Sequence, residues 1–297
     1  MTERRKASDF HPRILEIFDG YVHGRISKRD FMVQAAQFAT AGMSAAAIFE
    51  ALRPNYALAQ QVPADDPAIA TQTASYDSPQ GNGRISGLMA QPAGGAGGKL
   101  PAVLVVHENR GLNPYIEDVV RRLGKAGYLA FGPDGLSPLG GYPGNDEQGR
   151  EMQASLDPAK LMEDFFAAHE FLRDHPDSTG KVGAVGFCYG GGVCNALAVA
   201  YPELAASVPF YGRQPRPEEA VQIQAPLMLH YAETDQNVNA GWPAYEAALK
   251  ENGKEYQAFF YPGTQHGFHN DTTPRYDEAA AELAWQRTLD FFAEKLS

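Results

Sequence analysis

Cysteine is scarce in this chain, and long hydrophobic runs are absent from it. Only two cysteines, Cys188 and Cys194, occur among 297 residues. Cys188 is expected at the end of a strand and Cys194 inside the next helix, so a disulfide between them is sterically implausible and nothing points to an oxidising compartment. No zinc-type cysteine pair exists, and no apolar run reaches the length of a membrane-spanning helix.

Basic residues are also in the minority. The chain has 25 Lys and Arg against 36 Asp and Glu, which gives a net charge of −11 at pH 7. Such a surface repels phosphate backbones and anionic membranes, so nucleic acid and membranes are not expected as partners. Hydrophobic residues at 44% and charged residues at 21% describe a globular protein with a sizeable core, long enough for one α/β domain and an appendage.

The most informative stretch is Lys181–Val193, with the sequence KVGAVGFCYGGGV. Its apolar start, Val182–Phe187, predicts a strand buried on both faces, and a helix pattern of small residues follows the glycines. Read as G-x-C-x-G, the turn at Cys188 matches the nucleophile elbow of α/β-hydrolases, with a thiol in place of the hydroxyl. The following helix N-terminus would favour the thiolate and later an oxyanion. The alternative is a glycine-rich turn with a buried structural cysteine.

Strand and helix patterns alternate over the rest of the chain beyond residue 70. This alternation predicts βαβ units, a mostly parallel sheet with helices on both faces, and ligand binding at the carboxyl ends of the strands. Further strands are predicted at Thr71–Tyr76, Arg84–Gln91, Pro101–His107, Tyr128–Pro133, Ala206–Tyr211, Pro226–Ala232 and Tyr256–Tyr261, and helices at Ile116–Ala126, Pro158–Arg173, Trp242–Asn252 and Pro274–Leu296.

The N-terminal segment does not fit this alternation. Pro12–His23 and Lys28–Leu52 predict two helices, the second of which begins at a capping box. We therefore predict a helical arm over residues 1–62, a polar linker over 63–74 and a hydrolase domain over 75–297. The arm needs a partner for its apolar face, either the hydrolase domain or a second copy of the chain in a homo-oligomer.

The same N-terminal segment leaves the location of the protein open. The letters SKRDF, followed by an alanine-rich run, resemble a twin-arginine export signal in which lysine replaces one arginine. Gln34, Gln37 and Glu50 make that run polar for a signal, which favours an arm that is retained. A cytoplasmic location is therefore expected, with the periplasm as the alternative.

Four of the predicted strand ends carry reactive side chains. Glu108 lies in HENR after the first parallel strand, Cys188 ends the elbow strand, Asp235 lies in AETD, and His266 lies in GTQHGF after the last strand. The chain order of nucleophile, acid and base is that of the α/β-hydrolase triad. His266 would serve as the base for the Cys188 thiol, and Asp235 would orient the imidazole.

These four motifs, GFCYGGG, AETD, GTQHGF and HENRGLN, together resemble the dienelactone hydrolase family (carboxymethylenebutenolidase-like proteins) over about Ser75–Ser297, and the arm resembles its extended branch. The resemblance implies a cysteine nucleophile, an α/β-hydrolase fold and no cofactor. It also implies that Glu108 holds the resting thiol until substrate binds, and that the backbone N–H groups of Tyr189 and Asn109 form the oxyanion hole.

One position departs from the family pattern. Members that cleave dienelactone carry an arginine four residues after the catalytic histidine, and Asn270 occupies that place here. An amide cannot replace a bidentate carboxylate clamp, so dienelactone itself is in doubt as a substrate. Arg110, Tyr142 and Arg213 are the candidate residues that contact substrate instead.

The sequence thus predicts hydrolysis of a small carboxylic ester or lactone through a thioester. Two alternatives remain. Cys188 could instead be a peroxide or electrophile sensor, because a low-pKa thiol oxidises readily. The arm could make the protein a non-catalytic assembly subunit. A metal site formed by His266 and His269, with Glu108 or Asp235 as further ligands, is disfavoured because no third ligand lies at a recognised spacing.

Overall fold

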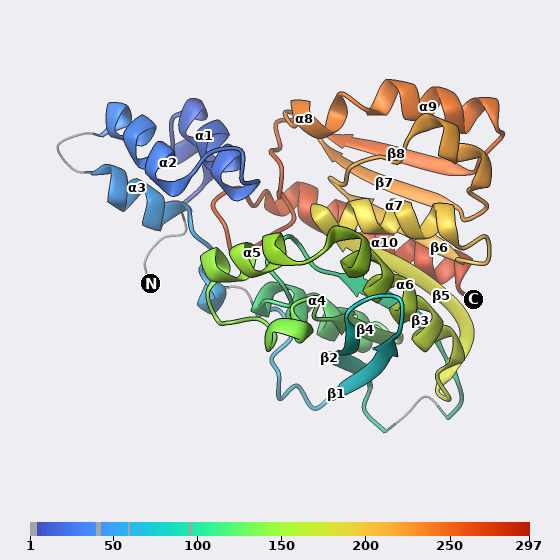
Figure 1. Cartoon of the computed structure of the whole chain (residues 1–297). Coiled ribbons are helices and arrows are strands. Elements are labelled where there is room, and N and C mark those ends of the chain that lie inside the picture. The colour runs from blue at the N-terminus through green and yellow to red at the C-terminus, as the bar shows by residue number, and fades with distance from the viewer. Residues whose placement is uncertain (1–4, 40–42, 59, 95–96) are drawn as a thin grey trace.

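The computed structural model describes residues 5–39, 43–58, 60–94 and 97–297. These residues form an N-terminal helical arm and a sheet with helices on both faces (Figure 1).

The strands are β1 (Ile69–Ser78), β2 (Gly83–Pro92), β3 (Leu100–Val106), β4 (Leu129–Pro133), β5 (Ser178–Phe187), β6 (Ala206–Phe210), β7 (Leu227–Ala232) and β8 (Tyr256–Tyr261). The α-helices are α1 (Pro12–Val22), α2 (Lys28–Ala35), α3 (Ala45–Leu52), α4 (Pro114–Lys125), α5 (Asp146–Ser155), α6 (Pro158–Asp174), α7 (Tyr189–Ala200), α8 (Gln236–Asn239), α9 (Trp242–Glu251) and α10 (Glu278–Lys295), and the 3₁₀ turns are η1 (Ala7–Asp9), η2 (Ala36–Phe38), η3 (Tyr56–Leu58), η4 (Ser137–Leu139) and η5 (Pro217–Gln222).

The sheet has the strand order β1-β2-β4-β3-β5-β6-β7-β8. The pairs β1/β2 and β2/β4 are antiparallel, and all the other neighbours are parallel. α-Helices lie between the successive strands β3, β4, β5 and β6 and between β7 and β8, and the 3₁₀ turn η5 lies between β6 and β7. The predicted α/β-hydrolase fold is confirmed.

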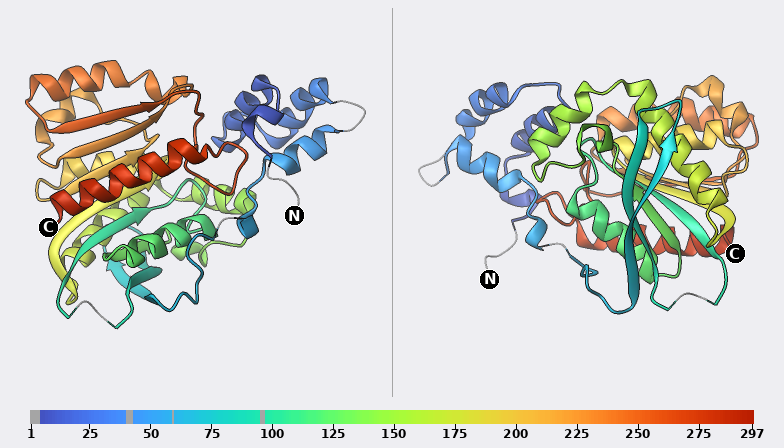
Figure 2. Two further views of the ribbon diagram at one scale, coloured as in Figure 1. Left: turned by 180° about the vertical axis from the view of Figure 1, so that it is seen from behind. Right: turned by 60° about the horizontal axis from the view of Figure 1, so that its bottom comes forward.

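The two faces of the sheet carry separate hydrophobic cores, and β3 contributes to both. Leu104 and Val106 pack in the core under α6, α7 and α9, while Val103 and Val105 pack in the core under α4 and α10. Figure 2 shows α10 in red along the face that α4 also covers. Each such aliphatic side chain stabilises the fold by roughly 1.5–3 kcal/mol through burial. Continuous burial explains why the parallel strands have apolar runs rather than alternating sequences.

The structure corrects three of the element boundaries. The predicted helix Lys28–Leu52 is interrupted after η2, because the Ser44 side chain accepts a hydrogen bond from Ala47 N–H and so starts α3 as a new helix. Strand β1 begins at Ile69, inside the segment 63–74 that we predicted as a linker. Helix α5, capped by Asn145, was not predicted. The arm prediction also includes residues 1–4, 40–42 and 59, which lie outside the described residues.

The arm has a small core of its own, built on aromatic rings. Phe18 and Phe31 meet edge to face with ring centroids 5.8 Å apart, and Tyr21 meets Phe49 in the same way at 5.3 Å. Edge-to-face pairs of this kind add about 0.5–1.5 kcal/mol beyond their burial. The arm therefore holds α1, α2 and α3 together as one unit.

Polar contacts dock the arm against the hydrolase body beside α5 (Figure 1). The Asn109 side-chain amide donates a 2.8 Å hydrogen bond to the Val22 carbonyl, and Arg150 donates to the Tyr21 carbonyl. The Arg150 guanidinium also lies 4.0 Å from the centroid of the Tyr21 ring. These contacts all reach the C-terminal end of α1, so that end of the helix is fixed to the body.

In the part of the chain that the structure describes, no helix combines the length and apolar character needed to cross a membrane.

Two buried histidines predict how stability depends on pH. Burial lowers the pKa of His169 to about 4 and that of His230 to about 3, so both stay neutral in the folded protein. The unfolded chain binds these protons below about pH 6.5, so stability falls as the pH drops from 6.5 towards 4. At pH 5 the loss is about 2 kcal/mol per histidine.

The substitution His169→Phe tests this expectation, because the ring lies against Tyr201 and its Nδ1 has no hydrogen-bond partner among the described residues. Urea unfolding at pH 7 and pH 5 should show an acid-induced loss about 2 kcal/mol smaller in the variant than in the wild type. Equal losses in both proteins would contradict the assignment.

Candidate active site

Cys188 sits at a strained turn between β5 and α7. Its backbone has φ 57° and ψ −112°, a region that costs a non-glycine residue about 1–3 kcal/mol. The turn requires glycine on both sides. A Cβ at Gly186 would lie 2.2 Å from the Gly190 carbonyl oxygen, and one at Gly190 would lie 2.2 Å from the Val106 carbonyl oxygen. The sequence around Cys188 therefore fits a nucleophile elbow, and the helix N-terminus follows directly after the thiol.

Asp235 and His266 form a carboxylate–imidazole pair beside this thiol. Asp235 follows β7, and its Oδ2 lies 2.5 Å from His266 Nδ1. A ring nitrogen of His266 lies within 4.8 Å of Cys188 Sγ. Burial alone would lower the pKa of His266, but attraction to the Cys188 thiolate and the hydrogen bond to Asp235 raise it well above its ordinary value.

A second imidazole, which the sequence did not reveal, reaches the same sulfur from the arm. His23 is the C-cap residue of α1, and its Nε2 lies 3.3 Å from Cys188 Sγ, at hydrogen-bonding distance. The rings of His23 and His266 meet edge to face with centroids 4.6 Å apart. Gly24 then turns the chain away with a φ of 71°, which leaves His23 at the tip of the helix.

Asp19 orients His23, as Asp235 orients His266. His23 Nδ1 lies 2.9 Å from the Asp19 carbonyl oxygen and 3.1 Å from its carboxylate. That carboxylate also pairs with Arg25 and lies 3.7 Å from Arg275 of the body. Burial alone would lower the pKa of His23, yet the Cys188 thiolate and the Asp19 hydrogen bond raise it to about 9. The sequence signal that could have revealed this pair is an acidic residue four positions before a histidine on a predicted helix.

The two imidazoles together stabilise the charged form of the thiol. Burial alone would raise the pKa of Cys188, but attraction to the His266 and His23 imidazoles lowers it to about 6. By contrast, burial raises the pKa of Cys194 far above its ordinary value. The structure thus distinguishes a thiolate at the elbow from an inert thiol inside α7.

Glu108 is buried near this group, and its partners are polar side chains of the body. Its Oε2 accepts a 3.2 Å hydrogen bond from the Asn270 amide and lies 3.6 Å from Arg110. Arg110 is in turn 3.2 Å from Asp146. In this structure the thiol contacts His23, whereas Glu108 contacts Asn270 and Arg110, so the role of Glu108 stays a prediction.

The predicted oxyanion donors lie on two elements beside the thiol. Tyr189 is the first residue of α7, and the first N–H groups of a helix have no partner within it. Asn109 follows Glu108, and its side chain is engaged with the arm through the Val22 carbonyl. Their donation to an oxyanion stays a prediction.

Of the remaining candidate residues, Arg110 and Tyr142 lie in a polar cluster, and Arg213 lies at the surface. Tyr142 donates a 2.7 Å hydrogen bond to Asp146, as Tyr56 of the arm segment also does, which places Tyr142 beside Arg110. Arg213 is exposed, and its carbonyl oxygen accepts from Asn195. The structure therefore brings Arg110 and Tyr142 into one polar cluster around Asp146 and leaves Arg213 outside it.

The His266 and His269 metal site that the sequence disfavoured does not form among the described residues. His269 is buried with its Nδ1 2.7 Å from the Tyr115 hydroxyl, and its ring stacks on Phe187 at 5.1 Å. It belongs to the core under α4 and α10. Among the described residues, the ligand-type side chains that gather with His266 are Cys188 and His23.

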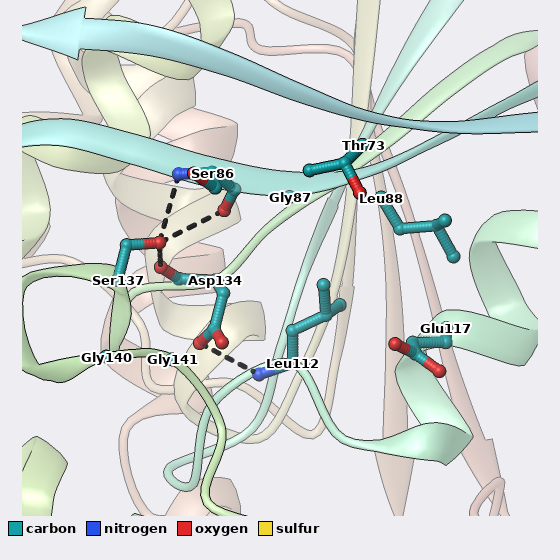
Figure 3. A pocket seen from close by; sticks show the side chains of 10 residues that line it. All are labelled: Thr73, Ser86, Gly87, Leu88, Leu112, Glu117, Asp134, Ser137, Gly140 and Gly141. Atoms are coloured by element: carbon teal, nitrogen blue, oxygen red, sulfur yellow. Dashed lines mark hydrogen bonds between the residues drawn. The ribbon is translucent and has the colours of Figure 1, made fainter.

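Two cavities lie near the arm and near β2. A cavity of about 30 Å³ lies where the arm meets the body, and it is lined by Phe18, Tyr21, Val22, Phe49, Arg53, Pro54, Asn109, Arg110, Asp146, Glu147 and Arg150. A larger one of about 340 Å³ opens near β2, and Figure 3 shows Asp134 and Ser137 at its wall. Asp134 accepts hydrogen bonds there from the backbone N–H groups of Leu112, Leu136 and Tyr142. The lining of the small cavity includes Asn109 and Arg110, which follow Glu108 in the chain, whereas neither lining contains a cysteine or histidine.

Two family models match separate parts of the chain. The dienelactone hydrolase family matches residues 85–296, and a YqhI-like family matches residues 1–40, which include His23. A "Putative carboxymethylenebutenolidase" of Methylorubrum extorquens is 31% identical over 267 residues, which cover 83% of this chain and 91% of its own. The "Putative hydrolase fragment YghX" of Escherichia coli is 60% identical over 116 residues, 39% of this chain and 98% of its own. The crystal structure of a "Putative Dienelactone Hydrolase" from Klebsiella pneumoniae has a TM-score of 0.65 and 26% identity, covering 76% of this chain and 99% of its own.

The strand order and the elbow between β5 and α7 define the protein as an α/β-hydrolase. Because the family match spans most of the chain, the protein belongs to the dienelactone hydrolase family. The resemblance drawn from the four sequence motifs is confirmed.

The different environments of the two thiols predict selective alkylation. Iodoacetamide at neutral pH should modify Cys188, which is largely thiolate, and leave Cys194 intact, because only the thiolate is nucleophilic. Intact-mass spectrometry of the folded protein should show a single adduct. Cys188→Ser is the control and should take up none. Earlier or equal labelling of Cys194 would contradict the assignment.

Proposed function

We propose that this protein hydrolyses a small carboxylic ester or lactone with Cys188 as the nucleophile and a thioester as the intermediate. The observation that carries the proposal is the placement of a carboxylate-oriented imidazole beside the elbow sulfur: Asp235 Oδ2 lies 2.5 Å from His266 Nδ1, and a His266 ring nitrogen lies within 4.8 Å of Cys188 Sγ. This is the arrangement that activates a nucleophile and then returns its proton.

Acylation begins when the Cys188 thiolate attacks the carbonyl carbon, forming a C–S bond and a tetrahedral oxyanion. The backbone N–H groups of Tyr189 and Asn109 would donate to that oxygen, and each such donor contributes about 3 kcal/mol in a dry site. Collapse of the intermediate breaks the C–O bond. The leaving alkoxide takes its proton from the His266 imidazolium, which the buried Asp235 carboxylate stabilises.

Deacylation reverses these roles. Neutral His266 removes a proton from water, the resulting hydroxide attacks the thioester carbonyl, and the C–S bond breaks. The thiolate is regenerated and the carboxylic acid leaves. The low pKa of Cys188 favours this step, because a thiolate of low basicity is a good leaving group.

The polar groups near the thiol favour an uncharged substrate. Asn270 occupies the place of the family's carboxylate-binding arginine, and its amide donates to Glu108. Arg110 is already paired with Glu108 and Asp146, so it offers little free charge to an anionic ligand. A substrate carboxylate placed beside Asn270 and Arg110 would therefore lack a free cationic partner there, at a cost of several kcal/mol.

Hydrolysis of the uncharged ester p-nitrophenyl acetate by variants of the three triad residues tests the proposal. Cys188→Ala should lower kcat/KM by about 10³-fold or more, and His266→Gln and Asp235→Asn by about 10²–10⁴-fold each. Cys194→Ala is the matched control and should retain nearly full activity, because Cys194 is buried inside α7.

Turnover that survives Cys188→Ala would overturn the nucleophile assignment. If no ester or lactone in a panel is hydrolysed while peroxide oxidises Cys188 stoichiometrically, the sensor alternative replaces the hydrolase.

A further inference from the structure

Three ligand-type atoms from distant parts of the chain converge at the active site. His23 comes from the end of α1, Cys188 from the elbow, and His266 from the loop after β8. One nitrogen of each histidine and the sulfur all lie within 4.8 Å of one another, and the His23 Nε2–Sγ distance is 3.3 Å. The triad by itself supplies only two of these groups, so the arm adds the third.

Both imidazoles are oriented in the manner of metal-binding histidines. Each uses Nδ1 for an acidic residue, His266 for Asp235 at 2.5 Å and His23 for Asp19 at 3.1 Å. Carboxylates of this kind fix the ring and raise its basicity at the other nitrogen. His266 Nε2 is buried and has no hydrogen-bond partner among the described residues. An unpartnered buried nitrogen aimed into the cluster is an independent indication of a ligand.

The distances and atom types fit a tetrahedral cation. Zn–S and Zn–N bonds of about 2.3 and 2.0–2.1 Å place tetrahedral ligands about 3.3–3.6 Å apart. The observed separations, 3.3 Å for one pair and at most 4.8 Å for the others, need changes in distance of at most about 1.5 Å. Two imidazoles and one thiolate suit Zn²⁺, whereas Mg²⁺ and Ca²⁺ require oxygen ligands.

We propose that His23, Cys188 and His266 form a three-ligand site for Zn²⁺, with the fourth position left for water. On binding, three bonds form from Zn²⁺ to the sulfur and the two imidazole nitrogens, and the protons held by these groups are released to solvent. No electron is transferred. The cation also joins the arm to the body, since His23 is the arm's only contribution to the ligand set.

Metal binding has a consequence for catalysis. The sulfur lone pair and the base nitrogen of His266 are both occupied, so Zn²⁺ inhibits hydrolysis, and a chelator restores it. The binding itself is independent of the proposed function, and only this inhibition rests on it.

Co²⁺ serves as the spectroscopic probe of the site on the full-length, chelator-treated protein. The wild type should bind one Co²⁺ with a thiolate-to-metal charge-transfer band and the intense visible bands of tetrahedral geometry, and Zn²⁺ should displace it. Cys188→Ser should lose the charge-transfer band. His23→Gln should bind at least about tenfold more weakly. His11→Gln, at an exposed arm histidine that caps α1, is the control and should bind like the wild type.

The hydrolase assay, run in parallel, separates this proposal from the proposed function. Absence of the thiolate band, or equal Co²⁺ affinity in the wild type and His23→Gln, overturns the metal site even if ester hydrolysis proceeds. A thiolate band that depends on His23 supports the metal site even if no ester is cleaved. Two results together support both the metal site and the proposed function. EDTA should reverse the Zn²⁺ inhibition of the wild type, and His23→Gln should weaken this inhibition by the same factor by which it weakens Co²⁺ binding.

Discussion

The active site depends on the interaction of one sulfur atom with two imidazoles. Cys188 is fully packed at a turn whose backbone strain the neighbouring glycines make possible, so the sulfur has a fixed position. Burial of a thiolate is unfavourable unless positive charge lies close by. His266 and His23 supply that charge, and Asp235 and Asp19 hold each ring in place. The reactivity of the thiol therefore depends on the docking of the arm, because the arm carries His23.

The arm is therefore more than an appendage to the hydrolase body. Its aromatic core makes it a unit, the Asn109 and Arg150 contacts fix the end of α1, and that end carries His23. The contact of His23 with Cys188 Sγ therefore exists only while the end of α1 is docked on the body. The charge state of Cys188 depends on that docking, because His23 is one of the two imidazoles that lower the pKa of the thiol.

Much of this site was predictable from the sequence, for a physical reason. In a parallel sheet the carboxyl ends of the strands meet at one edge, so residues that follow different strands converge, and that rule placed Cys188, Asp235 and His266 together. It could not place His23, because the docking of a separate helical segment depends on tertiary contacts such as those of Asn109 and Arg150. Strand β1 was missed at its start for a different reason. It is an edge strand with mostly exposed polar residues, and such a sequence resembles a linker.

The central claim is that Cys188 becomes acylated, and intact-mass spectrometry after rapid acid quench of enzyme mixed with excess p-nitrophenyl acetate tests it most directly. The account predicts an adduct of one acetyl group that maps to Cys188, accumulates further in His266→Gln as deacylation slows, and is absent from Cys188→Ala. Hydrolysis by the wild type with no adduct on Cys188, and with undiminished turnover in Cys188→Ala, would contradict it.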